Sequence, residues 1–102
     1  MRTIKLSKKA SHQLEQLFEY LEFEWSLKVK QEFIKKLDKS LKQIRQYPDG
    51  FPESKISKGL HMFVITKQTS LFYRYDAKTI YIITVFDNRS NPKKLKNELK
   101  QT

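Results

Sequence analysis

The chain has 102 residues, a formal net charge of +10, 38% hydrophobic residues and no cysteine. This length and composition predict one globular domain spanning residues 1–102, with a hydrophobic core of its own. Without cysteine, the chain can form no disulfide, no thiolate nucleophile and no cysteine-ligated metal cluster. It contains no run of about 20 apolar residues and no signal-peptide pattern, so we expect no membrane contact and a cytoplasmic location.

The positive charge is unevenly distributed along the sequence. Residues 27–47 contain seven basic and two acidic residues, whereas residues 7–26 contain two lysines and four glutamates. A basic surface of this kind favours polyanions such as nucleic acids, or an acidic protein partner. A lysine-rich surface that only keeps the protein soluble is the alternative. The charge therefore narrows the class of partner and identifies no activity.

Two amphipathic helices are predicted in the first half of the chain. Residues 2–6 alternate as a short strand does, and Ser7 and Ser26 can each cap the helix that follows. Both helices have apolar residues at spacings of three and four. Because so few residues separate them, the helices should form an antiparallel hairpin. The apolar positions are Ala10, Leu14, Leu17, Phe18, Leu21 and Trp25 in the first helix and Val29, Phe33, Leu37, Leu41 and Ile44 in the second.

A turn with two prolines and a glycine, YPDGFPES at residues 47–54, separates the helices from a strand-like second half. Beyond it, the pattern predicts strands at residues 54–59 (SKISKG), 60–67, 70–76 and 79–87, with consecutive strands pairing as an antiparallel meander. The strand at 79–87 is apolar on both faces, as a central strand is. Residues 93–102 could add a last turn or two of helix.

The predicted fold class is therefore α+β. It consists of an N-terminal strand and an antiparallel helix hairpin packed on a four- to five-stranded, mostly antiparallel sheet. The residues predicted to be buried between the hairpin and the sheet are Leu14, Leu17, Leu21, Phe33, Leu37, Leu41, Ile65, Leu71, Ile82 and Val85.

Metal sites and nucleophilic catalysis have little support in the sequence. The two histidines, His12 and His61, lie far apart along the chain, and no spacing of His, Asp and Glu fits a metal site. Two glycines are too few for a phosphate-binding loop. We therefore expect no metal and no cofactor.

Basic and polar residues of the predicted sheet remain as candidates for chemistry. Metal-free cleavage of RNA needs a base near the 2′-OH, cations on the scissile phosphate and an acid for the leaving group. Lysine, arginine, histidine and tyrosine can supply these groups, but they are also common on half-exposed sheets. A structural role is favoured for Tyr73 and Tyr81 and stays open for Arg74 and Arg89. The candidates are Lys55, Lys58, His61, Lys67, Arg74, Arg89 and Lys93, with Tyr73, Tyr75 and Tyr81 nearby.

Three segments, in this order and spacing, resemble the RelE/ParE superfamily of bacterial toxins. They are IRQYPDGFPES at the end of the second helix, SLFYRYD, and IYIITVFDNRSNPKKL, and the last closely resembles a tail common in ParE-like members. The resemblance covers almost the whole chain. It implies the toxin of a type II toxin–antitoxin pair, neutralised by a cognate antitoxin, for which we expect an acidic protein.

The resemblance implies two possible targets. RelE-like members cut messenger RNA on the ribosome, whereas ParE-like members act on DNA gyrase and are not nucleases. The nuclease pattern is incomplete here, because His61 and Ser70 stand where arginines are common and no Tyr or His follows Phe86. The sequence therefore favours a ParE-like toxin, with gyrase as an example of its target.

Two alternatives stay open beside the ParE-like toxin. One is a RelE-like endoribonuclease in which Lys55, Lys58, His61 and Arg74 form the catalytic set. The other is an inactivated family member that serves as a binding module. For either toxin we predict that Arg74, Arg89 and Lys93 contact the target or the antitoxin, although Arg89 could instead pair with Asp87 or cap a carbonyl.

Overall fold

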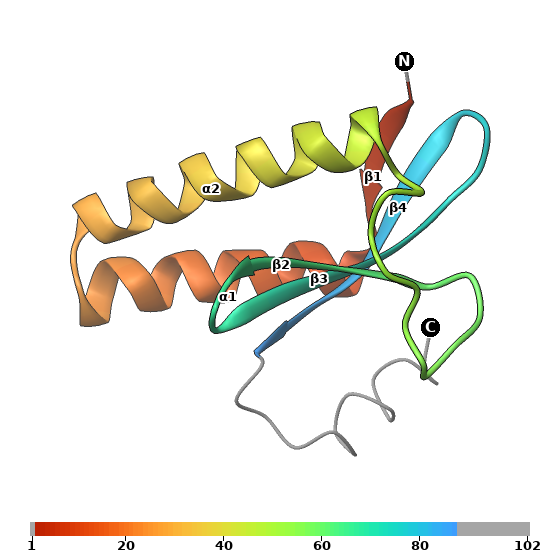
Figure 1. Cartoon of the computed structure of the whole chain (residues 1–102). Helices are drawn as coiled ribbons and strands as arrows, with labels where there is room; N and C mark the ends of the chain where they lie inside the picture. Colours follow the sequence, from red (N-terminus) through yellow and green to blue (C-terminus); the bar gives the residue numbers. More distant parts are fainter. Residues whose placement is uncertain (1, 88–102) are drawn as a thin grey trace.

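The computed structural model describes residues 2–87, which form two helices and a four-stranded sheet (Figure 1). The chain runs through β1 (Thr3–Leu6), α1 (Lys8–Glu24), α2 (Leu27–Gln46), β2 (His61–Thr66), β3 (Thr69–Tyr75) and β4 (Thr79–Asp87). The predicted α+β class is confirmed, and so is the order of its elements except for the strand predicted at residues 54–59. The predicted helical turns at 93–102 lie outside the described residues.

The sheet has the strand order β1-β4-β3-β2. β4 pairs antiparallel with β3, which pairs antiparallel with β2, so the predicted meander is confirmed. β1 pairs parallel with β4 and ends where Leu6 lies beside Ile82. β4 is thus a central strand, as its apolar residues on both faces indicate.

The strand predicted at residues 54–59 is wrong. These residues form a bend and a turn, and only Glu53 makes an isolated bridge, to His61. Gly59 has φ +80°, a left-handed conformation that does not continue a strand, and its N–H donates to the Glu53 carboxylate. The segment therefore satisfies part of its backbone locally instead of joining the sheet.

Serine caps start both helices, as predicted. Ser7 Oγ accepts the Ala10 N–H at 2.9 Å and Ser26 Oγ accepts the Val29 N–H at 3.1 Å. Ser7 Oγ also donates to the Ile83 carbonyl at 2.8 Å, which fixes the start of α1 against β4. Only Trp25 and Ser26 separate the helices, so they form the predicted hairpin.

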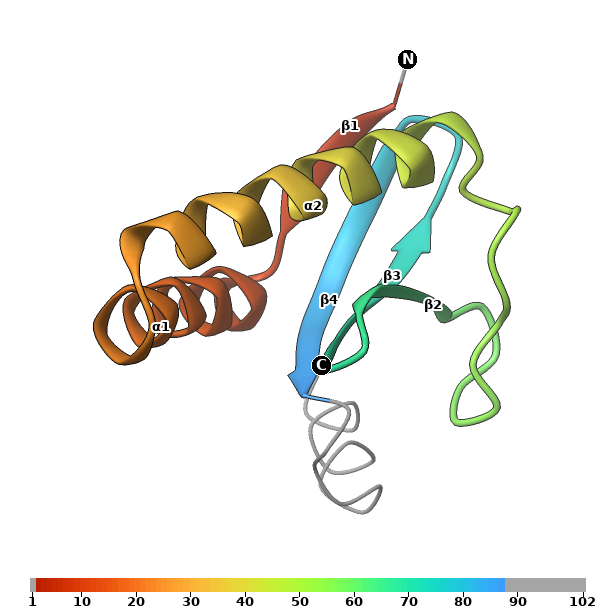
Figure 2. The same cartoon turned by 60° about the vertical axis from the view of Figure 1, so that its left-hand side comes forward.

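The hairpin packs on one face of the sheet, and the main core lies between the two layers (Figure 2). Six of the ten residues predicted to be buried are buried there, and the other four are half-buried. The buried six are Leu14, Phe33, Leu37, Leu71, Ile82 and Val85, and the half-buried four are Leu17, Leu21, Leu41 and Ile65.

Trp25 does not belong to this core, because it caps the C-terminal end of α1 and its side chain is 67% exposed. Figure 1 shows the reason, since the connected ends of α1 and α2 extend beyond the sheet. A smaller cluster of Leu60, Phe72 and Phe86 is separate from the main core. Among the described helices, none is long and apolar enough to cross a membrane.

Candidate functional site

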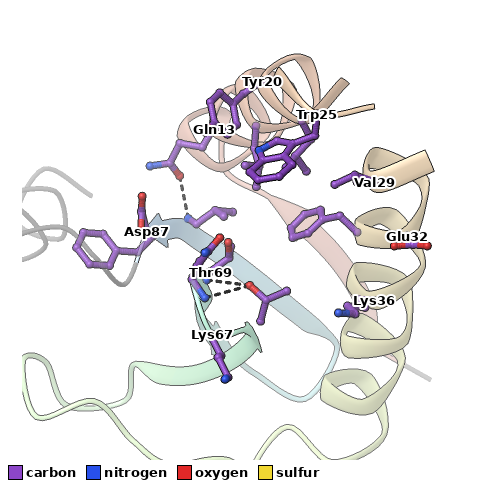
Figure 3. A pocket seen from close by; sticks show the side chains of 16 residues that line it. Gln13, Tyr20, Trp25, Val29, Glu32, Lys36, Lys67, Thr69 and Asp87 are labelled. Carbon is purple, nitrogen blue, oxygen red and sulfur yellow. Dashed lines mark hydrogen bonds between the residues drawn. The ribbon is translucent and has the colours of Figure 1, made fainter. Parts of the chain in front are cut away.

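An open groove of about 760 Å³ lies where the helix hairpin extends past the sheet (Figure 3). One wall comes from α1 and α2, and the other comes from residues 66–69, where β2 turns into β3. The last residues of β4, Val85 to Asp87, also line it. The groove therefore brings together segments that are distant in the sequence, and its existence depends on the overhang of the hairpin.

The helical wall of the groove is apolar. Leu17 and Leu21 come from α1, and Val29 and Phe33 come from α2. These residues belong to the stripes that make both helices amphipathic. Leu14, nearer the start of α1, packs in the main core, whereas Leu17 and Leu21 of the same apolar stripe line the groove. Phe33 is itself buried in the main core, so the exposed apolar surface of this wall comes from the half-buried Leu17, Leu21 and Val29.

Large apolar side chains are also exposed where the two helices connect. We call Tyr20, Phe23, Trp25 and Leu27 the hairpin-end patch; their side chains are 48%, 89%, 67% and 52% exposed. Tyr20 and Trp25 line the groove as well. Several large apolar side chains exposed at one end of a small protein commonly mark an interaction site.

Gln13 of α1 joins the helical wall to β4. Its Oε1 accepts the Val85 N–H at 2.8 Å (Figure 3). The same oxygen accepts the Thr84 hydroxyl at 3.1 Å. Since β1 ends beside Ile82, it provides no partner for this part of β4. The Gln13 side chain thus substitutes for a neighbouring strand and holds α1 against the end of the sheet.

Charged side chains of both signs surround the apolar wall. Glu32 and Lys36 come from α2, Lys67 from the turn after β2, and Asp87 from the end of β4. A groove with an apolar wall and a mixed charged rim suits an amphipathic helix, whose apolar face it can bury. Among residues 2–87, no group of three His, Cys, Asp or Glu side chains could hold a metal ion.

Arg74 binds the loop that precedes β2. Its guanidinium donates to the Lys58 carbonyl at 2.9 Å and to Ser57 Oγ at 2.8 Å. Lys55 and Lys58 are exposed on the loop that Arg74 holds. The structure therefore brings three of the four candidate nuclease residues to one region.

His61 lies on the other face of the sheet. It pairs in register with Tyr73, the neighbour of Arg74 in β3, and its ring stacks on Tyr73 with centroids 5.4 Å apart. Its Nδ1 lies 2.8 Å from the Phe51 carbonyl oxygen, which can only accept, so Nδ1 carries the proton. Because successive residues of a strand point to opposite faces, His61 and Arg74 are separated by the sheet.

Tyr73 is fully buried in the main core, as its predicted structural role requires. Its hydroxyl donates to the Pro48 carbonyl at 2.6 Å and fixes the turn after α2. Burial raises the pKa of the Tyr73 phenol well above its usual value, and the nearby Tyr75 and Asp49 raise it further. Tyr81, in contrast, is 38% exposed, and its hydroxyl lies 3.3 Å from Asp76 Oδ2.

The remaining predicted contact residues, Arg89 and Lys93, lie outside the described residues. The groove itself is not among the sequence predictions. Its signal in the sequence is two aromatic residues at the end of α1, Tyr20 and Trp25, which are exposed and line the groove. Gln13 has no comparable signal, because a glutamine on a helix surface is ordinary.

The strand, the helix hairpin and the three-stranded meander, with the hairpin on one face, form the fold that the RelE/ParE resemblance implies. The chain matches the family model of the ParE toxin of type II toxin-antitoxin system, parDE, over residues 4–92, and belongs to this family. It is a ParE-type toxin.

A solved structure described as the chromosomal ParDE TA system from P. aeruginosa has the same fold. The match has a TM-score of 0.71 and 16% sequence identity, and it covers 85% of this chain and 96% of that chain. None of the curated proteins matches the chain significantly.

Proposed function

We propose that this toxin inhibits growth by binding a target such as DNA gyrase, without catalysing a reaction. We further propose that a cognate antitoxin neutralises it by placing an amphipathic helix in the groove. The observation that carries the proposal is the apolar wall of the groove, to which the exposed side chains of Tyr20 and Trp25 add. Burial of this surface would supply most of the binding free energy.

Charge supports an acidic antitoxin. The chain carries +10 in total, and the basic residues of α2 include Lys36 beside the groove. An acidic segment that is disordered alone can fold as it wraps such a surface. Its association rate should fall with added salt, because electrostatic steering is screened over roughly 8 Å at physiological ionic strength. An association rate that does not change with salt concentration would exclude electrostatic steering.

The position of His61 supports binding over RNA cleavage. A nuclease built from Lys55, Lys58, His61 and Arg74 needs all four near one phosphate, but His61 lies across the sheet from Arg74. The hydrogen bond to Phe51 and the stacking on Tyr73 hold the imidazole there. The family and its ParDE relative support an antitoxin partner. The proposed target follows from the ParE-like resemblance of the sequence alone.

Inducible expression in bacteria tests the proposal directly. We expect growth arrest that is relieved by co-expression of the reading frame adjoining the toxin gene. Supercoiling by purified gyrase should fall when the toxin is added, and primer extension should find no new cuts in messenger RNA. Codon-specific cuts would support the RelE-like alternative, and normal growth would support an inactivated binding module.

Trp25→Ala tests the groove as the antitoxin site. We expect roughly tenfold or greater loss of antitoxin affinity, since exposed tryptophans at the centre of interfaces are frequent hot spots. The variant should keep its melting temperature, because Trp25 is 67% exposed. Phe23→Ala is the matched control, since Phe23 is still more exposed but does not line the groove. Equal losses in both variants would place the antitoxin on the hairpin-end patch instead.

A further inference from the structure

Away from the groove, a loop from Glu53 to Leu60 presents two exposed lysines, Lys55 and Lys58. We call residues 53–60 the basic loop. Arg74 reaches it from β3, on the face of the sheet opposite the main core. The antitoxin groove does not include any residue of this loop.

Side chains hold the basic loop in one conformation. Arg74 donates to the Lys58 carbonyl and to Ser57 Oγ, and the Glu53 carboxylate accepts the Gly59 N–H. Gly59 has φ +80°, and a Cβ atom at this position would lie 3.1 Å from Arg74 Nη1. The left-handed backbone therefore favours glycine here, and a Cβ atom would also crowd the guanidinium. The loop is preformed.

A further cation, Lys5, lies on the same face as Arg74. Lys5 pairs in register with Tyr81, and Tyr81 pairs with Arg74, so the three side chains form one row across β1, β4 and β3. Lys5 is exposed, and Tyr81 is 38% exposed between the two cations. The carboxylates nearby, Glu53 and Asp76, each accept hydrogen bonds from backbone N–H groups.

We propose that this face, the basic loop with Lys5 and Tyr81, binds the phosphate backbone of a nucleic acid. Lys5, Lys55 and Lys58 contact phosphates, and Arg74 is a positioning residue that holds the loop. The exposed lysines of this face, Lys5, Lys55 and Lys58, outnumber its exposed large apolar side chains, Ile56 and Tyr81. The buried centre of a protein interface is instead depleted in lysine and enriched in large apolar anchors. Nucleic-acid interfaces are polar and strongly basic, and aromatic side chains often lie between their cations.

The proposal does not rest on antitoxin binding, since the two surfaces share no residue. A fluorescein-labelled DNA duplex of about 20 base pairs, of arbitrary sequence, is the first probe, and single-stranded RNA with the same number of phosphates is the second. Fluorescence anisotropy at several salt concentrations gives the affinity and its salt dependence for each. The probe that binds with the higher affinity shows whether the phosphates come from DNA or from RNA.

Lys55→Gln combined with Lys58→Gln tests the contacts. We expect roughly tenfold weaker binding, and a salt slope reduced by about 1 for each lysine, because each phosphate contact releases close to one counterion. The matched control is Lys35→Gln with Lys39→Gln, which removes the same charge from the exposed surface of α2. Equal effects of the two pairs would mean that only net charge matters and would overturn the proposal.

Arg74→Gln tests the positioning role, with Lys35→Gln as its single-charge control. We expect faster hydrogen exchange at the Gly59 amide, and a several-fold larger loss of affinity than in the control. The variant's circular dichroism spectrum should match that of the unchanged protein, which separates a freed loop from unfolding. Unchanged nucleic-acid affinity in the folded variant would exclude this role.

Polyglutamate that binds as tightly as DNA, with the same lysine dependence, would assign the face to acidic proteins and overturn the proposal.

Discussion

Gln13 Oε1 accepts the backbone N–H of Val85 at 2.8 Å, in the part of β4 that β1 does not reach. One side chain from α1 thereby takes the place of a missing strand. The same oxygen accepts the Thr84 hydroxyl, so two polar groups of β4 depend on a single residue. Thr84 is fully buried, which makes an alternative partner for its hydroxyl hard to find.

Gln13→Ala should lower the free energy of unfolding by about 1–3 kcal/mol, since it leaves a backbone donor and a hydroxyl without their acceptor. Urea denaturation measures this difference. Gln16→Ala is the matched control, because it makes the same substitution in the same helix at an exposed position. If both variants lose the same small amount, Gln13 contributes no more than helix propensity.

Much of the fold could be predicted from periodicity, because the spacing of Leu14, Phe33 and Leu37 reflects directly which side of each helix is buried. Ser7 and Ser26 predict the helix starts, because a serine cap depends only on a backbone N–H three residues further along the chain. The sequence pattern wrongly predicts a strand at residues 54–59, because the conformation of this loop depends on Arg74, which lies far along the chain. Sequence spacing does not report such distant contacts.

The candidate site was less predictable than the fold. The groove exists because the hairpin is longer than the sheet beneath it, and relative lengths and docking angles of layers leave no periodic signal. The separation of His61 from Arg74 depends on strand register, and a register shift of one residue would reverse the face of each side chain. Residue type alone indicated a basic surface without indicating its geometry.

Leu37→Ala should destabilise the protein by about 2–5 kcal/mol, the usual cost of removing a large side chain from a packed core. Leu37 is 8% exposed and packs in the main core. Ile34→Ala in the same helix is the control, since Ile34 is 38% exposed. Thermal unfolding of the two variants compares them. A negligible change at Leu37 would contradict the position of α2 on the sheet.

Asp76 should contribute stability that is lost in acid. Its carboxylate accepts the backbone N–H groups of Lys78 and Thr79, both at 2.8 Å, and these bonds lower its pKa in the folded state. A lowered folded pKa means that the contribution is present above the unfolded value of about 4 and disappears as the pH falls through the folded pKa.

Asp76→Asn should therefore flatten the dependence of stability on pH below about 4, because asparagine can accept the same bonds but does not titrate. Urea titrations at a series of pH values measure the slope. The matched control is Asp38→Asn, which removes the same charge from the exposed surface of α2 and leaves the turn between β3 and β4 unchanged. An acid slope in Asp76→Asn as steep as that of the unchanged protein would exclude a role of this carboxylate.

Tyr73 should make the protein sensitive to alkali. Burial raises the pKa of its phenol in the folded state, whereas the unfolded chain has the ordinary value of about 10. Between these two values the unfolded state has lost the proton and the folded state keeps it, so unfolding is favoured as the pH rises. The contribution of Tyr73 is thus fully present below pH 10 and is lost progressively above it.

Tyr73→Phe separates this titration from the hydrogen bond to Pro48. At neutral pH the variant should be less stable by about 1–2 kcal/mol, because the buried Pro48 carbonyl loses its donor. Above pH 10 its stability should fall less steeply than that of the unchanged protein, so the difference between the two should narrow. Tyr20→Phe is the control, since Tyr20 is 48% exposed. Parallel alkaline curves for Tyr73→Phe and the unchanged protein would show that the phenol of Tyr73 titrates alike in both states.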